Sequence, residues 1–283
     1  MSAMQHPIAT WVLVVGVTFV LGCQEKSHQG GQPDRAVSLT SFASDRNRAE
    51  ATDTGEVTMA LDAASSSQRY LFVYAWKTDD ERTQAMRKTF RAFIGDVAGR
   101  ADCVELSVAA GTDKSFVDKY CLSRAPMPLV LAFAPNGAIT NAFPQQFSRD
   151  DLTAGFVSNG TANCMKLLQD GKLVVLCVQN ARTQANEAAL AGVEEFCRDE
   201  RYRSAMEVIT IDPADTAEAP FLNDLQISSN TSIAITVLLA PPGSPIAKFE
   251  GATTMDAFLE AITKASSGCC PGGQCGPDGS GLR

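Results

Sequence analysis

The 283-residue sequence predicts an α/β protein with two tandem domains, each a mixed β-sheet sandwiched by helices. Three observations predict this architecture. One order of elements occurs twice, at an offset of about 104–106 residues. Apolar strands are joined through amphipathic helices, which implies parallel pairing with a right-handed crossover. A turn directly follows the third strand of each copy, which implies an antiparallel hairpin.

The first copy reads helix, strand, helix, strand, helix, strand, strand, helix. Its second element, YLFVYAW (Tyr70–Trp76), is a continuous apolar run, and the helix after it shows apolar residues at helical spacing. Its elements are expected near residues 57–64, 70–76, 86–97, 104–108, 116–122, 129–133 and 139–143, and from 149 onward.

The second copy follows the same course. Phe249 and Phe258 match Phe143 and Leu152 at an offset of 106 residues, and agreement over separate landmarks indicates duplication. Its first helix is expected near 164–168, its next helix near 190–196, and its strands near 173–178, 207–211 and 235–239, with a Pro-Pro-Gly turn at 241–243.

This order of elements resembles the thioredoxin fold. The stretch APMPLVLAFAPNGAI (Ala125–Ile139) is similar to the part of that family in which a cis proline precedes the third strand. The resemblance covers residues 56–158 and, more weakly, 160–265, and it implies that Pro128 is the cis residue. Ala234 stands at the corresponding place of the second copy, which argues against a peptide-gripping role there.

Redox-active members of that family carry a Cys-x-x-Cys pair where the helix after the first strand begins. The helix start supplies free N–H groups and a partial positive charge that stabilise a thiolate. Here the tetrapeptide from Thr78 to Glu81 (TDDE) occupies this place, and Gln179–Thr183 of the second copy also lacks cysteine. The tetrapeptide fits a capping box in which the side chains of Thr78 and Glu81 accept hydrogen bonds from the free backbone N–H groups at the start of the helix. The alternative is a carboxylate-based site that uses Asp79, Asp80 or Glu81.

The cysteines of the predicted domains are read mainly as structural. Cys103, Cys177 and Cys197 lie in apolar or amphipathic elements, where a cysteine is most often a small buried hydrophobe or part of a bridge. Cys121 stands seven residues before Pro128 and is the one weak catalytic candidate. The even number of cysteines after Cys23 permits disulfides, but spacing does not give their pairing.

The N-terminus predicts an exported, lipid-anchored protein. Ile8–Gly22 is a run of 15 uncharged residues, short of the about 20 that a spanning helix needs, so residues 1–22 fit a signal peptide. The residues Val20–Cys23 (VLGC) resemble the bacterial lipobox, which implies lipidation of Cys23 and a bacterial envelope location, in the periplasm or at the cell surface. An uncleaved short anchor and an ordinary secretory signal are the alternatives.

Two further segments flank the domains. Residues 23–54 read as a flexible linker between the leader and the domains expected at 55–158 and 159–265. Residues 266–283 form a Gly- and Cys-rich tail, in which Cys269, Cys270 and Cys275 could hold a soft metal such as Cu or Zn, or act as a redox arm. A low-complexity end without a role is the alternative.

Charge and histidine content exclude some functions. The formal net charge of -8 disfavours nucleic-acid binding, and the only histidines, His6 and His28, precede the predicted domains. No Ser/His pair, Cys/His pair or His-based metal site is therefore available in a core. The expected function is protein binding or scaffolding beside another envelope protein, without redox activity. The alternative is a thiol oxidoreductase or metal-handling protein that uses the tail, and an enzyme with other chemistry is a third, weaker reading.

Overall fold

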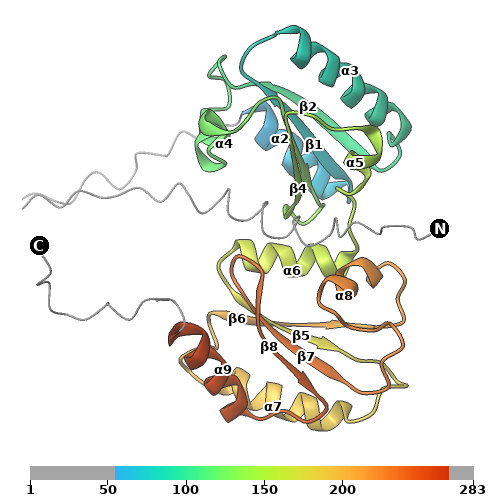
Figure 1. Ribbon diagram of the computed structural model, residues 1–283. Helices are drawn as coiled ribbons and strands as arrows, with labels where there is room; N and C mark the ends of the chain where they lie inside the picture. The colour runs from blue at the N-terminus through green and yellow to red at the C-terminus, as the bar shows by residue number, and fades with distance from the viewer. Residues whose placement is uncertain (1–54, 268–283) are drawn as a thin grey trace, which may run out of the picture. The chain divides into compact units, whose positions relative to one another are not determined.

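The computed structural model describes residues 55–267, and the chain divides into two compact units. We call the elements α2 to α5 the first domain and the elements α6 to α9 the second domain (Figure 1). The first domain contains α2 (Glu56–Ser66), β1 (Tyr70–Trp76), α3 (Glu81–Asp96), β2 (Ala101–Ser107), α4 (Lys114–Lys119), the 3₁₀ turn η2 (Leu122–Arg124), β3 (Leu129–Phe133), β4 (Ile139–Pro144) and α5 (Arg149–Thr153).

The second domain repeats this order. It contains α6 (Asn159–Gln169), β5 (Leu173–Val178), α7 (Asn186–Arg198), β6 (Met206–Ile211), α8 (Ala219–Asp224), β7 (Ile235–Ala240), β8 (Ser244–Glu250) and α9 (Met255–Ser267).

Both domains have a four-stranded mixed sheet with the same strand order. The order is β2-β1-β3-β4 in the first and β6-β5-β7-β8 in the second. β1 pairs in parallel with β2 and antiparallel with β3, and β5 makes the same two kinds of pair with β6 and β7. The predicted fold class, two tandem thioredoxin-like α/β domains, is confirmed.

The cores explain why the central strands are continuous apolar runs. β1 and β5 are buried on both faces, so their side chains need no polar alternation. In the second domain Leu176 packs with the cluster on the α6 and α8 side, whereas Val175 packs with the cluster that contains Phe196 and Phe258. The rings of Phe196 and Phe258 stack with centroids 4.7 Å apart and join α7 to α9.

A buried carboxylate ties two helices together in each domain. Asp113, which precedes α4, accepts a hydrogen bond from the backbone N–H of Val57 at 2.9 Å. Glu218, which precedes α8, accepts one from the backbone N–H of Gly160 at 3.0 Å. Each donor is the second residue of its domain's first helix, so the duplication extends to this polar contact.

Several predicted features lie outside residues 55–267. These are the signal peptide 1–22, Cys23, the whole of the linker 23–54, and Cys269, Cys270 and Cys275 of the tail. Within the range that the structure describes, no helix has the length and apolar character needed to cross a membrane.

Candidate functional site

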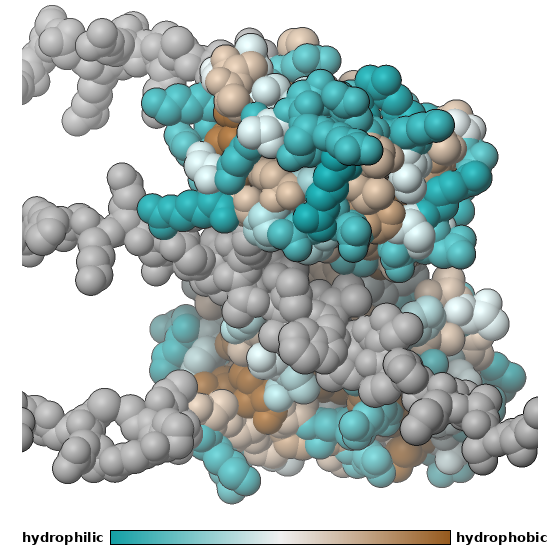
Figure 2. Space-filling model, turned by 45° about the horizontal axis from the view of Figure 1, so that its top comes forward, coloured by the Kyte–Doolittle hydropathy of each residue, from teal (hydrophilic) through white to brown (hydrophobic). Residues whose placement is uncertain are grey.

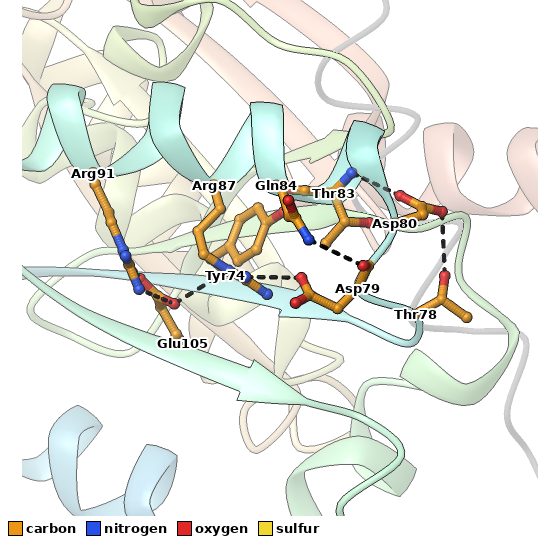
Figure 3. Close-up of polar contacts among 9 residues, drawn as sticks. All are labelled: Tyr74, Thr78, Asp79, Asp80, Thr83, Gln84, Arg87, Arg91 and Glu105. Carbon is orange, nitrogen blue, oxygen red and sulfur yellow. Dashed lines mark hydrogen bonds and ion pairs between the residues drawn. The ribbon is translucent and has the colours of Figure 1, made fainter.

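The start of α3 is the place where a redox-active relative would carry its dithiol. The N-cap of this helix is Asp80, whose Oδ1 accepts the backbone N–H of Thr83 at 2.8 Å (Figure 3). The hydroxyl of Thr78 donates to the other carboxylate oxygen of Asp80 at 3.3 Å. The predicted capping box is therefore wrong in its residues, because α3 begins at Glu81 and the cap falls on Asp80 instead of Thr78. Asp80 is preferred because its extended backbone aims an ionised oxygen at the first turn.

The electrostatics of this helix start favour a carboxylate. The N–H of Thr83 holds the pKa of Asp80 below its usual range, so Asp80 is ionised at neutral pH. The ionised carboxylate occupies the positive end of α3 that would otherwise stabilise a thiolate. A group with a lowered pKa is also a poor proton donor near pH 7, which argues against acid catalysis by Asp80.

An arginine-centred network fixes the neighbouring residues. The Arg87 guanidinium lies 4.4 Å from the centroid of the Trp76 ring, and it pairs with Asp79 at 2.8 Å and with Glu105 at 3.4 Å. Glu105 also pairs with Arg91, through Nη2 and Oε2 at 2.9 Å. Figure 3 shows the charged side chains of this network, which come from α3, β2 and the loop after β1. Asp79 is thus held in an ion pair on this surface.

Tyr74 connects this network to the core. Its hydroxyl donates to the carbonyl oxygen of Thr83 at 2.6 Å, and its ring stacks on Phe90 with centroids 5.4 Å apart. Burial is the largest cause that raises the pKa of Tyr74 to about 12. The first turn of α3 is therefore held from both sides, by Asp80 at the amide of Thr83 and by Tyr74 at its carbonyl.

The segment Ala125–Pro128 lies before β3, and the Met127–Pro128 peptide bond is cis. Pro126 is exposed, Met127 is half-buried and Pro128 is buried. Lys77, which follows β1, donates from Nζ to the carbonyl oxygen of Ala125 at 3.2 Å. Within residues 55–267 the backbone of Met127 makes no hydrogen bond. Both of its backbone polar groups are therefore available for an extended ligand.

Cys121, the thiol singled out in the sequence, is disulfide-bonded. It is 8% exposed and adopts a left-handed backbone conformation with φ of 52° at the start of η2. In this state Cys121 offers no thiolate for nucleophilic attack.

The four free cysteines show no sign of activation. Burial raises the pKa of Cys164 to about 12 and that of Cys177 to about 11. Burial is also the main cause that raises the pKa of the partly buried Cys197. The expectation of a buried Cys103 is wrong, because β2 buries Val104 and Leu106 on one face and Cys103 lies on the other, exposed face. Partial desolvation and the nearby Glu105 nevertheless raise its pKa.

Within residues 55–267 no cluster of metal ligands is found, and few large hydrophobic side chains are exposed. No group of three or more His, Cys, Asp or Glu residues in the range 55–267 could hold a metal ion. Figure 2 shows one face of the molecule, on which apolar side chains occur in separate patches between hydrophilic ones. Of the large hydrophobic residues in the described range, only Met59 and Val208 are exposed. Single exposed apolar residues need no functional explanation.

No protein-family model matches the chain, and no curated protein matches it. Among solved structures, it is similar to the first two thioredoxin domains of Saccharomyces cerevisiae Eps1p, with 8% identity, a TM-score of 0.28, and coverage of 73% of this chain and 94% of that chain. An N-terminal domain of alkylhydroperoxide reductase AhpF from Enterococcus faecalis shows 12% identity, a TM-score of 0.24, and coverage of 72% and 96%. Human ERp44 shows 10% identity, a TM-score of 0.32, and coverage of 76% and 55%.

These identities and TM-scores are too low to support any argument about activity. The fold rests on the chain's own strand order, which is the same mixed four-stranded arrangement in both domains. We conclude that the chain contains two tandem thioredoxin-like domains, and that neither carries a cysteine where the helix after its first described strand begins.

Proposed function

We propose that this protein is a bacterial envelope lipoprotein, anchored through Cys23, whose two domains bind or scaffold another envelope protein without dithiol chemistry. The observation that carries the proposal is the occupation of the α3 N-terminus by the Asp80 carboxylate. An ionised acid there cannot exchange disulfides, and it uses the amide that would stabilise a thiolate. The raised pKa values of the described free thiols support the same conclusion.

The segment Ala125–Pro128 is the binding site that the geometry supports best. The backbone of Met127, which makes no hydrogen bond within residues 55–267, can exchange hydrogen bonds with an extended peptide, as an added strand does. The exposed ring of Pro126 and the half-buried side chain of Met127 supply apolar contacts beside it. Recognition through the backbone suits a partner defined by its extended conformation more than by its sequence.

A photocrosslinking experiment on the full chain tests this site. The photoreactive residue p-benzoylphenylalanine replaces Met127 in one variant and the exposed Met59 of α2 in the control. We expect adducts with reduced, carboxymethylated α-lactalbumin, an unfolded probe, at position 127 and not at position 59. Equal adducts at both positions, or none at position 127, would contradict the proposal.

The absence of redox activity and the anchor need separate measurements. In an insulin-reduction assay we expect no thiol-dependent turnover, and Cys121→Ala should change nothing. The intact mass of protein extracted from membranes should show lipid that Cys23→Ser abolishes.

A second candidate is a thiol oxidoreductase or a handler of Cu or Zn that uses Cys269, Cys270 and Cys275. The three cysteines within seven residues of the tail favour it, because thiolates are the preferred ligands of soft metals. Deletion of residues 266–283 separates the two functions. Loss of bound metal or of thiol turnover in the truncated chain would support the second candidate.

A further inference from the structure

The second domain differs from the first at the place that corresponds to Met127. By the 106-residue offset, Ser232, Ile233 and Ala234 correspond to Pro126, Met127 and Pro128. Gln184, in the loop before α7, forms an isolated parallel bridge with Ile233. The N–H of Gln184 donates to the carbonyl oxygen of Ser232, and the N–H of Ala234 donates to the carbonyl oxygen of Gln184, both at 2.9 Å.

The backbone around Ile233 is therefore already used by the chain itself. The carbonyl oxygen of Ala234 also accepts the N–H of Gly251 at 2.8 Å. In the first domain, by contrast, Pro128 has no N–H to donate and the backbone of Met127 makes no hydrogen bond within the described range. Where the described part of the first domain leaves the backbone of Met127 open, the second domain pairs Ser232 and Ala234 with its own loop. The N–H and the carbonyl oxygen of Ile233 are bonded to the hydroxyl of Thr231.

The loop that makes this contact is held in place by its own hydrogen bonds. The N–H of Asn180 donates to Oγ1 of Thr183 at 2.9 Å, and Nδ2 of Asn186 donates to the carbonyl oxygen of Asn180 at 2.7 Å. The side chain of Asn180 also donates to Asp212, which follows β6, at 2.7 Å. This loop, Gln179–Ala185, is thus tied to α7 and to the end of β6 as well as to Ile233.

We propose that Gln179–Ala185 is a built-in strap that occupies the second domain's counterpart of the Met127 site and so confines binding of extended peptides to the first domain. The peptide-binding part of this inference rests on the proposed function. The strap itself rests on the two backbone hydrogen bonds of Gln184. Opening it would free the carbonyl oxygen of Ser232, which now accepts the N–H of Gln184, for an added strand.

Ala234→Pro in the full chain tests the strap. This change removes the N–H that donates to Gln184, and it installs the residue that the first domain has at this place. In wild type we expect slow hydrogen exchange at the amides of Gln184 and Ala234. Loss of one hydrogen bond should speed exchange at Gln184 by roughly tenfold. Gln184→Ala is the matched control, because it removes only the side chain and should leave exchange slow.

Photocrosslinking provides the second readout. With p-benzoylphenylalanine at the exposed Ser232, we expect no adduct with carboxymethylated α-lactalbumin in the wild-type background and an adduct in the Ala234→Pro background. Gln184→Pro, which removes the other N–H of the bridge, replaces Ala234→Pro if circular dichroism shows that the latter is unfolded.

The outcomes separate the strap from the proposed function. Fast exchange at Gln184 in wild type, or an opened strap without an adduct at position 232, would overturn the inference. Missing adducts at position 127 would instead count against binding by the first domain. Slow exchange that Ala234→Pro abolishes would still support the strap in that case.

Discussion

The carboxylate of Glu218 accepts a hydrogen bond from the backbone N–H of Gly160, 58 positions earlier in the chain. It also accepts hydrogen bonds from the hydroxyls of Ser158 and Thr161, so one buried acid satisfies three donors at the start of α6. Glu218 is 6% exposed, and a buried acceptor of this kind is costly to leave unmatched. The first helix of the second domain is therefore docked by an acid that precedes α8.

Glu218→Gln should destabilise the second domain by about 2 kcal/mol, the usual worth of a hydrogen bond to a charged group. Glutamine carries an NH2 group in place of one carboxylate oxygen. This NH2 group would face at least one of the three groups that now donate to Glu218. Hydrogen exchange measured by mass spectrometry of peptide fragments should show faster exchange in α6 and α8 of the variant. Glu200→Gln, an equal charge change at an exposed residue, is the control and should change neither helix. An equal effect of both variants would refute the docking role.

Asp80 should make the stability of the first domain depend on acid pH. Its folded pKa is lowered by the N–H of Thr83, so its contribution is complete above the unfolded value of about 3.9 and is lost as pH falls through the folded pKa. The difference in stability between wild type and Asp80→Ala in denaturant unfolding should therefore be full at pH 7 and begin to shrink as pH falls below about 4. Asp80→Asn keeps a capping oxygen without the charge and serves as the control. A difference that stays constant with pH would contradict the assignment.

Patterns local in sequence predicted the fold, because buried central strands and repeated landmarks appear in the residue types themselves. The continuous run from Tyr70 to Trp76 indicated a strand covered on both faces, and the structure has it there. The exposure of Cys103 was missed, although the alternation of Val104 and Leu106 puts Cys103 on the opposite face of β2. The cap on Asp80 was also missed, because Thr78 two residues earlier is another favourable capping residue and fits the spacing of a capping box.

Contacts between distant backbones had no signal in the sequence. The bridge between Gln184 and Ile233 uses only main-chain atoms, so the residue types at these positions do not predict it. The contact of Glu218 with α6 joins residues that only the tertiary fold brings together. The candidate site was therefore predictable in its position, from the missing cysteines, but not in the features that distinguish the two domains.

Tyr74 should cause a loss of stability at alkaline pH. Its folded pKa of about 12 exceeds the unfolded value of about 10, so its contribution is complete below pH 10 and falls as pH rises toward 12. Tyrosinate absorbance at 295 nm should show one group that titrates near pH 12 and is missing in Tyr74→Phe. The variant should also unfold with less pH dependence between 10 and 12. Unchanged titration in the variant would show that the late group is another residue.

Two helical glycines should respond in opposite ways to alanine. A Cβ at Gly192 in α7 would lie 2.1 Å from the backbone oxygen of Thr253, whereas a Cβ at Gly95 in α3 would meet nothing within 4 Å. Gly192→Ala should therefore cost about 2 kcal/mol through overpacking between α7 and the segment before α9. Gly95→Ala should add about 0.5 to 1 kcal/mol, because alanine is the better helix former. Thermal unfolding of both variants beside wild type measures this. Destabilisation of equal size at the two positions would mean that loss of glycine as such, and not the close approach of Thr253, sets the cost.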